Sequence, residues 1–431
     1  MSSGRVHRAR LRNGLQVLLK EIHTAPITSV WIWYRVGSRN ERAGQTGVSH
    51  WVEHMQFKGT PTFPPGLLDR TISREGGMWN AMTWLDWTAY YETLPSDRVD
   101  LALRLEADRM AQSLFANKDV TSERTVIISE RQGNENEPTF RLSEEVQAAA
   151  FRVHSYHHEV IGDVADLASM TREDLFSHYR RYYIPNNAIL TVAGDFQWRP
   201  MLARIRELYG NLPPAAPPPQ ITRPEPAQRG ERRVSVEGPG ETAFVDVAYH
   251  VPPASDPEFF PLIVLDSVLS GPSNFNLFGA GISNKTSRLY RALVEKELAV
   301  GVSGGVSATI DPFMHSITAT LHPNASADQA LQALDEEVKR LQDSPPDEGE
   351  VARAVKQARA LFAYGSESIT NQAFWMGYSE MFASYDWFVN YLERLAAVTP
   401  GDVQRIAQTY LRPQNRVLGF YLPGGDQEVG S

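Results

Sequence analysis

Two stretches of the sequence repeat one another and decide the fold, TREDLFSHYRRYYIPNNAILTVA at residues 171–193 and TPGDVQRIAQTYLRPQNRVLGFY at residues 399–421. Six residues are identical at a constant offset of 228 positions: Thr171/Thr399, Asp174/Asp402, Tyr182/Tyr410, Pro185/Pro413, Asn187/Asn415 and Leu190/Leu418. Each copy reads as a Thr-x-x-Asp helix start, an amphipathic helix, a proline turn and an apolar strand. The sequence therefore predicts one α+β unit that is present twice.

A proline-rich segment separates the two copies. Residues 211–230 read NLPPAAPPPQITRPEPAQRG, in which seven prolines disfavour both helix and central strand. Such a composition favours a stiff, extended connector. We therefore expect an N-terminal domain at residues 1–210 and a homologous C-terminal domain at residues 231–431.

Strand-like runs also stand near the front of each half, at residues 27–34 and 243–249, and helical patterns follow both. Strands and helices do not alternate strictly along either half. This order favours layered antiparallel or mixed sheets with helices on one face over a doubly wound parallel sheet. The predicted fold class is α+β, with two homologous layered domains.

The composition is that of an ordinary globular chain and argues against several classes of function. Hydrophobic residues make up 42% and charged residues 22% of the 431 positions, and no apolar run reaches the length of a membrane span. A net charge of −9 gives no broad basic surface for nucleic acid. Because the chain has no cysteine, any bound metal must be held by His, Asp or Glu.

The beginning of the sequence is basic, with four arginines before the first acidic residue, Glu21: Arg5, Arg8, Arg10 and Arg12. This pattern resembles an organelle transit peptide, but a basic lead-in to a strand at residues 14–21 explains it more simply. No apolar signal core precedes that strand. We expect a cytoplasmic location, with a periplasmic or organellar one open if a leader has been removed.

The motif His50-Trp51-Val52-Glu53-His54 carries the chemistry. It lies in a segment that opens at Thr46-Gly47 and closes at Lys58-Gly59, which predicts a short helix. On a helix, His50 and His54 share one face and can grip one cation, while Glu53 can reach a metal-bound water as general base. This is the H-x-x-E-H pattern of inverted zinc peptidases. The alternative is a solvated helix face without a metal.

A third metal ligand is expected from residues 121–131, TSERTVIISER, a second helix candidate. Glu123 and Glu130 are seven residues apart, almost two whole turns, and therefore lie on one face. One of them could bind the metal while the other orients a histidine. Without the HxxEH motif, the simpler interpretation of Glu123 and Glu130 is a solvent-exposed acidic face of a helix.

The chain resembles the pitrilysin-like (M16) metallopeptidases. The stretch GVSHWVEHMQFKGT at residues 47–60 is similar to their active-site helix. Further stretches similar to family signatures stand at residues 37–41, 76–91, 123–130, 154–162 and 182–196. The likeness covers essentially the whole chain, and the size resembles the short two-domain branch that contains mitochondrial processing peptidase subunits and bacterial relatives.

The resemblance implies a zinc-dependent endopeptidase and assigns its residues by position. One Zn²⁺ would be held by His50, His54 and Glu130. Glu53 would be the general base, and Glu123 would be the companion acid of the catalytic site.

The resemblance also implies that an extended peptide adds to an edge strand at Asn80 and Ala81, with Phe57 among the substrate-binding residues. For Asn80, the plain alternative is a turn residue after Gly76-Gly77.

The second half departs from the family pattern. Active members carry an Arg and a Tyr where this sequence reads SRLYRALVEKELAV at residues 287–300, and with a one-residue gap Val294 and Val300 take their places. Valine can neither form an ion pair nor donate a hydrogen bond. We therefore expect a heterodimer in which a homologous partner supplies the Arg/Tyr pair. A shifted alignment would instead recruit this chain's own side chains, Arg288, Tyr290 or Arg291.

Other interpretations stay open. The chain could be a non-catalytic scaffold subunit of the same family, although four matched site residues argue against this. It could also be a non-peptidase hydrolase that uses the same metal chemistry. The run HSYHHE at residues 154–159 is a competing metal cluster, but it reads as a loop.

Overall fold

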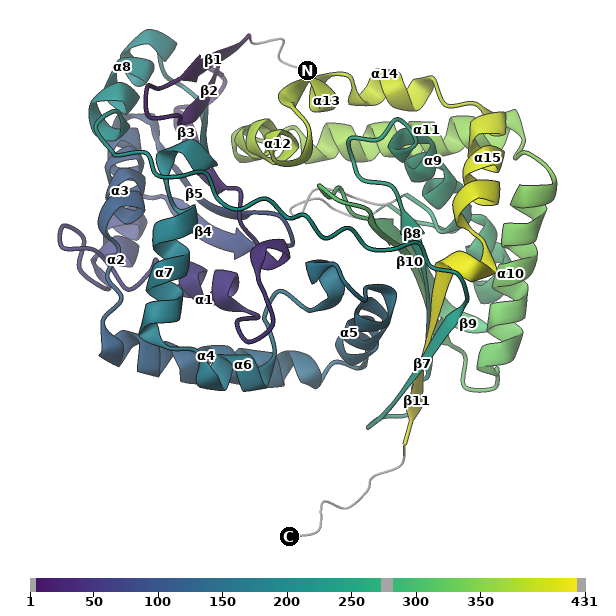
Figure 1. The fold of residues 1–431 in the computed structure, drawn as a ribbon. Helices are drawn as coiled ribbons and strands as arrows, with labels where there is room; N and C mark the ends of the chain where they lie inside the picture. The colour runs from purple at the N-terminus through teal and green to yellow at the C-terminus, as the bar shows by residue number, and fades with distance from the viewer. Residues whose placement is uncertain (1–4, 273–281, 425–431) are drawn as a thin grey trace. The chain divides into compact units, whose positions relative to one another are not determined.

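The computed structural model describes residues 5–272 and 282–424, which form two compact units (Figure 1). Unit 1 takes residues 5–132, 158–222 and 366–388, and unit 2 takes residues 133–157, 223–272, 282–365 and 389–424. Each unit thus includes a segment from the other half of the sequence. The boundary between the two halves of the sequence therefore does not coincide with the boundary between the two compact units.

Unit 1 is built on a six-stranded mixed sheet in the order β1-β2-β6-β3-β5-β4. β2 and β6 are parallel, and the other neighbouring pairs are antiparallel. The two edges of the sheet are β1 and β4. The strands are β1 Val6–Arg10, β2 Gln16–Glu21, β3 Ile27–Tyr34, β4 Met78–Thr83, β5 Thr88–Pro95 and β6 Ala188–Gly194.

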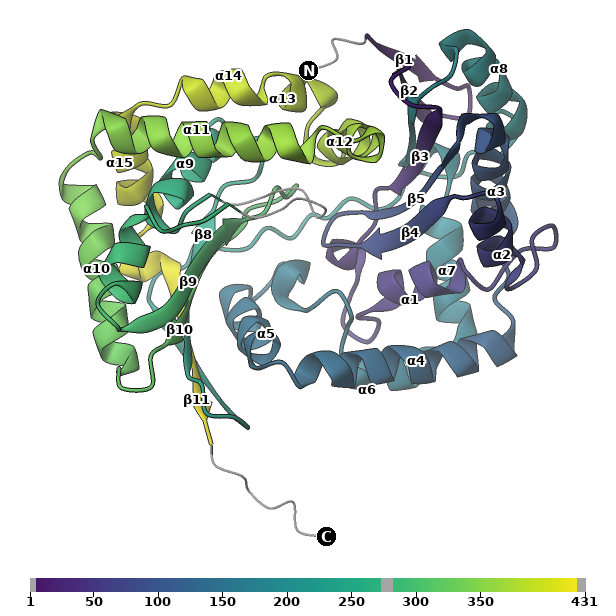
Figure 2. The same cartoon turned by 180° about the vertical axis from the view of Figure 1, so that it is seen from behind.

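Helices cover both faces of this sheet. α1, α3 and α8 contact the strands from one side, and α12 packs on β2, β3 and β6 from the other (Figure 2). The helices of unit 1 are α1 Val48–Met55, α2 Leu67–Arg74, α3 Val99–Gln112, α4 Asn117–Glu135, α6 Val164–Ser169, α7 Arg172–Tyr182, α8 Trp198–Tyr209, α12 Ile369–Phe382 and α13 Tyr385–Val389, with 3-10 turns η1 Ser38–Asn40, η2 Ser96–Arg98 and η4 Pro185–Asn187.

The alternation of side chains along β3 explains why it needs cover on both sides. Trp31 and Trp33 are fully buried and pack against Phe374 of α12, with ring centroids 5.4 and 5.5 Å apart. Tyr34 belongs to the opposite face, where its ring lies 4.4 Å from that of Tyr183. A strand that is apolar at successive positions therefore becomes the centre of the unit.

Unit 2 repeats the plan with five strands in the order β7-β11-β8-β10-β9. Here β7 and β11 are parallel, and β9 is an edge strand. The strands are β7 Arg232–Gly238, β8 Phe244–Val251, β9 Ala299–Val306, β10 Phe313–Leu321 and β11 Arg416–Pro423. The helical elements are α5 Pro138–Ala150, α9 Phe259–Leu269, α10 Ala327–Asp343, α11 Glu348–Gly365, α14 Tyr391–Ala396 and α15 Pro400–Tyr410, with the short turns η3 Ser155–His157, η5 Tyr290–Val294 and η6 Pro413–Asn415.

α5 covers the sheet of unit 2 although it belongs to the first half of the sequence. It packs on β7, β8 and β11. The approach is close at Gly419 of β11, where a Cβ atom would lie 2.3 Å from the Val146 side chain. α5 therefore completes unit 2, as α12 completes unit 1.

The predicted duplication is confirmed in detail. Helix, 3-10 turn and strand follow one another as α7, η4 and β6 in unit 1 and as α15, η6 and β11 in unit 2. Both helices begin with the same capping box, in which the threonine hydroxyl donates to the aspartate three residues later at 2.6 Å: Thr171 to Asp174, and Thr399 to Asp402. The predicted α+β class with mixed sheets holds, and the structure adds α12 on the second face of the first sheet.

The linker, residues 211–230, contains no helix or strand. Hydrogen bonds hold it in place near both of its ends. The Asn186 side-chain amide exchanges two hydrogen bonds with the backbone of Ala215, at 3.0 and 3.1 Å, within unit 1. The Glu225 carboxylate accepts three backbone N–H bonds within unit 2, at 2.8 to 3.0 Å, from Arg152, Val153 and His154. No helix in the part of the chain covered by the structure is long and apolar enough to cross a bilayer.

The packing of α12 on β3 gives a stability test. A Cβ atom on Gly377 would lie 2.0 Å from Nε1 of Trp33, whereas one on Gly133, inside α4, would meet no atom within 4 Å. Alanine gains helix propensity at both glycines, so the difference between the two variants isolates the clash. We expect Gly377→Ala to be less stable than Gly133→Ala by about 1–3 kcal/mol, the usual cost of overpacking, in urea unfolding. Equal unfolding midpoints for the two variants would contradict the tight contact.

Candidate active site

A close crossing of two backbone segments fixes the start of α1. Gly47, its N-cap, has φ 83°, and a Cβ atom there would lie 2.4 Å from the carbonyl oxygen of Ile161. Gly162 has φ 81° and is equally crowded by the backbone at Thr46 and Gly47. Only glycine combines a left-handed backbone with this proximity. The helix therefore begins at one defined place against the 161–162 turn.

The residues of α1 face either the hydrophobic core or the candidate site. Trp51, Val52 and Met55 are fully buried and anchor the helix. His50 and His54 are turned toward α4, and Glu53 is turned toward the end of β4. The apolar side chains of this eight-residue helix pack into the core. Its three ionisable side chains, His50, Glu53 and His54, face the candidate site.

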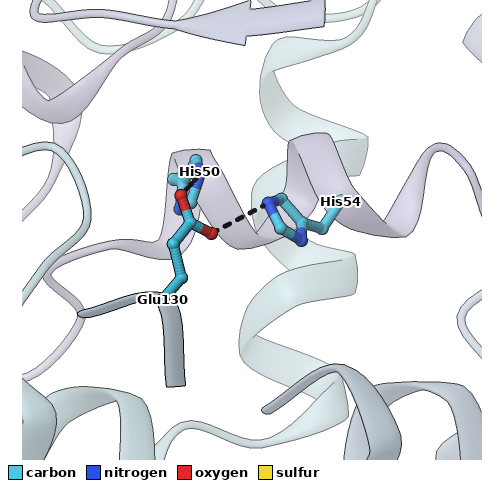
Figure 3. Close-up of side chains that lie close together, drawn as sticks. All are labelled: His50, His54 and Glu130. Carbon is cyan, nitrogen blue, oxygen red and sulfur yellow. Dashed lines mark ion pairs between the residues drawn. The ribbon is translucent and has the colours of Figure 1, made fainter. Parts of the chain in front are cut away.

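The structure brings together the three residues that the sequence predicts as metal ligands. One carboxylate oxygen of Glu130 lies 3.8 Å from Nε2 of His50, and the other lies 3.6 Å from Nε2 of His54 (Figure 3). One ligand atom from each residue lies within 4.8 Å of the other two. In the residues that the structure describes, no other cluster of His, Asp and Glu reaches this geometry.

These distances suit a shared cation better than direct hydrogen bonds. At 3.6 and 3.8 Å the nitrogen and oxygen atoms are too far apart to be hydrogen bonded. Ligand atoms placed tetrahedrally at about 2.1 Å from one ion lie about 3.4 Å apart. Burial lowers the pKa of His50 to about 3, so this imidazole is neutral at pH 7, as a metal ligand must be. The donor set therefore fits a divalent ion of the zinc type.

Glu123 orients His54 from the far side of the ring. Its Oε1 lies 2.9 Å from Nδ1 of His54, which directs Nε2 toward Glu130, and its Oε2 forms an ion pair with Lys58. Burial would raise the pKa of Glu123, but the hydrogen bonds from His54 and Lys58 lower it, so the group is ionised. Burial alone would lower the pKa of His54, yet the bond to Glu123 and the nearby carboxylates raise it. Such a pairing fixes the tautomer that presents Nε2 to a metal.

Glu53 is buried beside these ligands and is held by the sheet. Its Oε2 accepts a hydrogen bond of 2.6 Å from Oγ1 of Thr83, the last residue of β4. Burial raises the pKa of Glu53 to about 7, while the Thr83 bond opposes the rise. A cation close by would favour the ionised form and lower this pKa. Glu53 thus stands where a proton acceptor near neutral pH is useful.

Asn80 and Ala81 lie in the middle of β4, an edge strand that pairs only with β5 among the strands described. Asn80 is exposed, and its side-chain oxygen accepts the N–H of Ala81 at 2.9 Å. That N–H is therefore capped by a side chain that could swing away. Phe57 packs on Trp79 of the same strand, with ring centroids 4.7 Å apart. The three predicted substrate-binding residues lie on or against one free strand edge.

Sequence reasoning missed two residues of this site. Lys58 lies one turn beyond His54, a spacing that could have predicted its approach to Glu123. Thr83 gave no local signal, because its contact with Glu53 depends on how β4 packs against α1. The competing histidine run is dispersed: His154 pairs with Asp311 at 3.0 Å, and His157 hydrogen bonds to the His154 carbonyl at 3.1 Å.

The described residues of unit 2 form no equivalent site. α9 follows β8 as α1 follows β3, but it is buried along its whole length and contains no histidine. Val300 is 58% exposed on the edge strand β9. Arg288 is held by Glu350 through two hydrogen bonds of 2.9 and 2.6 Å. Of the possible substitutes for the missing pair, Arg288 is thus engaged within unit 2, whereas Arg291 is exposed.

Comparison with known proteins agrees with this architecture. Residues 16–164 match the model "Insulinase (Peptidase family M16)", and residues 169–358 match "Peptidase M16 inactive domain". Zinc protease PqqE of Helicobacter pylori is 26% identical over 427 residues, covering 96% of this chain and 92% of that protein. The beta subunit of the mitochondrial-processing peptidase of Lentinula edodes is 25% identical, covering 95% and 88%.

A solved structure agrees with the fold along its whole length. The crystal structure of a protease from Helicobacter pylori has a TM-score of 0.91 and 26% identity, and the alignment covers 97% of this chain and 100% of that one. A duplicated α+β chain with these relatives is a member of a metallopeptidase family. The chain belongs to peptidase family M16.

The ligand geometry gives a binding test. We expect the purified chain to bind about one divalent zinc-type ion, because three protein ligands with one open position form such a site. His54→Ala should lose the metal, as measured by elemental analysis, because it removes one of the three donors. His23→Ala is the control, because His23 lies outside the cluster and pairs with Asp195. Unchanged metal content in His54→Ala would refute the assignment.

Proposed function

We propose that this chain is a zinc-dependent endopeptidase that cleaves peptides or unfolded segments. The observation that carries the proposal is the convergence of His50, His54 and Glu130 beside Glu53, which is itself hydrogen bonded to the end of a free strand edge. The names of the relatives, zinc proteases among them, support zinc as the metal.

In this proposal His50, His54 and Glu130 hold the zinc ion. The ion would act as a Lewis acid, polarising the scissile carbonyl and lowering the pKa of a water molecule. Glu53 accepts the proton of the attacking water and passes it to the leaving amine. Thr83 holds one oxygen of Glu53, which leaves the other for this transfer. Glu123 keeps His54 in the tautomer that binds.

The substrate would be held by β4. An extended peptide adds to the free edge of this strand through backbone hydrogen bonds, and the Asn80 side chain releases the Ala81 N–H, which then donates to a backbone carbonyl of the substrate. Phe57 and Trp79 form an aromatic pair against which a substrate side chain can pack. This arrangement suits extended or unfolded segments, because a folded strand has its own partners.

Glu53→Gln separates metal binding from catalysis. The amide cannot accept a proton, so we expect peptide turnover to fall by about 10²–10⁴-fold while the zinc content stays unchanged. Glu130→Gln is the matched comparison, since it replaces a ligand and should lower both. Turnover of a quenched peptide together with elemental analysis measures the two effects. Activity of Glu53→Gln within a few-fold of the parent would exclude Glu53 as the base.

We further propose that this chain is the metal-binding subunit of a heterodimer. The metal half of the site is complete in unit 1, whereas Val294 and Val300 occupy the positions where the family resemblance implies an Arg and a Tyr. A partner that supplies this pair would clamp the peptide, and such positioning can contribute several kcal/mol to catalysis. The rival is a non-catalytic scaffold, which would need no metal and would show no turnover with any partner.

Mixing and gain-of-function experiments test the heterodimer. We expect the chain alone to be a poor peptidase, and the addition of a homologous M16 chain with an intact Arg/Tyr pair to raise turnover and the mass in size-exclusion chromatography. The double variant Val294→Arg, Val300→Tyr should raise the activity of the single chain. Arg291→Ala is its control, because loss of activity there would identify a substitute within this chain. Full activity of the unmodified chain by itself would contradict the heterodimer.

A further inference from the structure

Glu41 lies in the segment before α1 and is buried beneath the start of that helix. Its side chain has no solvent exposure. Its two carboxylate oxygens accept backbone hydrogen bonds from Gly47 at 2.8 Å and from Ser49 at 2.7 Å. Burial raises the pKa of this carboxyl to about 8, and the two backbone hydrogen bonds oppose the rise.

These bonds replace a cap that α1 cannot provide for itself. The first N–H groups of a helix have no partner within it and are usually satisfied by the side chain of the N-cap residue. The N-cap of α1 is Gly47, which has no side chain, because the backbone crossing at Gly162 admits none. Glu41 reaches in from six residues upstream and satisfies these donors with both of its oxygens.

The capped residues are adjacent to a proposed metal ligand. Ser49 directly precedes His50, so the N–H that Glu41 holds belongs to the backbone that carries the His50 imidazole. The Ser49 hydroxyl is fixed as well, by the carbonyl of Gly37 at 3.1 Å and Nε2 of His178 at 3.2 Å. No protein hydrogen bond reaches the buried Nδ1 of His50 in the described chain. His54 is oriented by the hydrogen bond from its ring to Glu123, whereas the His50 ring packs edge-on against that of His54, with centroids 4.6 Å apart, and its Nδ1 has no such partner among the described residues.

We propose that Glu41 is the positioning residue of His50, doing through the helix backbone what Glu123 does for His54 through the imidazole. This inference rests on the proposed zinc site. Glu41 touches neither metal nor substrate. Its effect is on the tilt and rotation of the first turn of α1, which set how far Nε2 of His50 lies from the carboxylate of Glu130.

The variant Glu41→Gln tests this, because its amide nitrogen cannot accept one of the two N–H bonds. The control is Asp402→Asn, which weakens the cap of α15 in unit 2, where Asp402 accepts from the Thr399 N–H at 3.0 Å and from its hydroxyl at 2.6 Å. Both variants lose a helix cap, so both should lower the melting temperature of the metal-free chain. Only Glu41→Gln should change the metal site.

Zinc affinity is measured by competition with a chromophoric chelator, and site geometry by the visible absorption of the cobalt-substituted chain. We expect Glu41→Gln to bind zinc about 10–100-fold more weakly, as loss of an orienting partner does in other metal sites, and to shift the cobalt bands. Asp402→Asn should leave both as in the parent. Glu41→Asp can keep one of the two hydrogen bonds, so its zinc affinity should lie between those of the parent and Glu41→Gln. If Glu41→Gln does not fold, Glu41→Asp is compared with Asp402→Asn instead.

The outcomes separate this inference from the proposed function. A parent that binds zinc, with a Glu41→Gln variant of equal affinity and unchanged cobalt spectrum, overturns the positioning role alone. Equal losses of affinity in Glu41→Gln and Asp402→Asn would show a general effect of stability and overturn it too. A parent that binds no zinc overturns the zinc site and this inference together.

Discussion

The crossing of Gly47 and Gly162 is the constraint on which unit 1 depends. Two backbone segments meet there with no side chain between them, so α1 has one place to begin. From that point the helix rise carries His50 and His54 to positions one turn apart on the side of α4. A side chain at either glycine would push the two segments apart and displace the start of the helix that carries both imidazoles.

α4 carries two acids whose surroundings differ, and these surroundings suit them to the different roles that we propose. Glu123 is buried and held by His54 and Lys58, so it is fixed in place and its oxygens are occupied. The Glu130 side chain is 43% exposed and approaches both histidines without hydrogen bonding to either. A fixed acid can orient a ring, and an accessible one can bind an ion. The same residue type on the same helix face is thus suited to two different roles.

Much of the architecture could be read from the sequence, because its signals are local. The repeated Thr-x-x-Asp starts, the proline turns and the apolar strands each act over a few residues, and the HxxEH spacing places two histidines on one helix face. The seven-residue spacing of Glu123 and Glu130 likewise predicts that both acids lie on one face of a helix. Thr83 and Glu41 were not assigned roles, because their partners are set by tertiary packing. The packing of α5 and α12 was also hidden, since the apolar residues of a helix do not say which sheet the helix covers.

Each sheet is covered by a helix from the opposite half of the sequence: α12 covers the sheet of unit 1, and α5 covers the sheet of unit 2. Two identical half-length chains that exchanged one helix each would form a domain-swapped homodimer with this pattern of contacts. Fusion of their genes would give the present chain, with residues 211–230 as the join. After such a fusion neither half can be inherited alone without leaving an apolar sheet face bare. The second half has no histidine in α9, yet it supplies α12 and is therefore still needed to cover the sheet of the first.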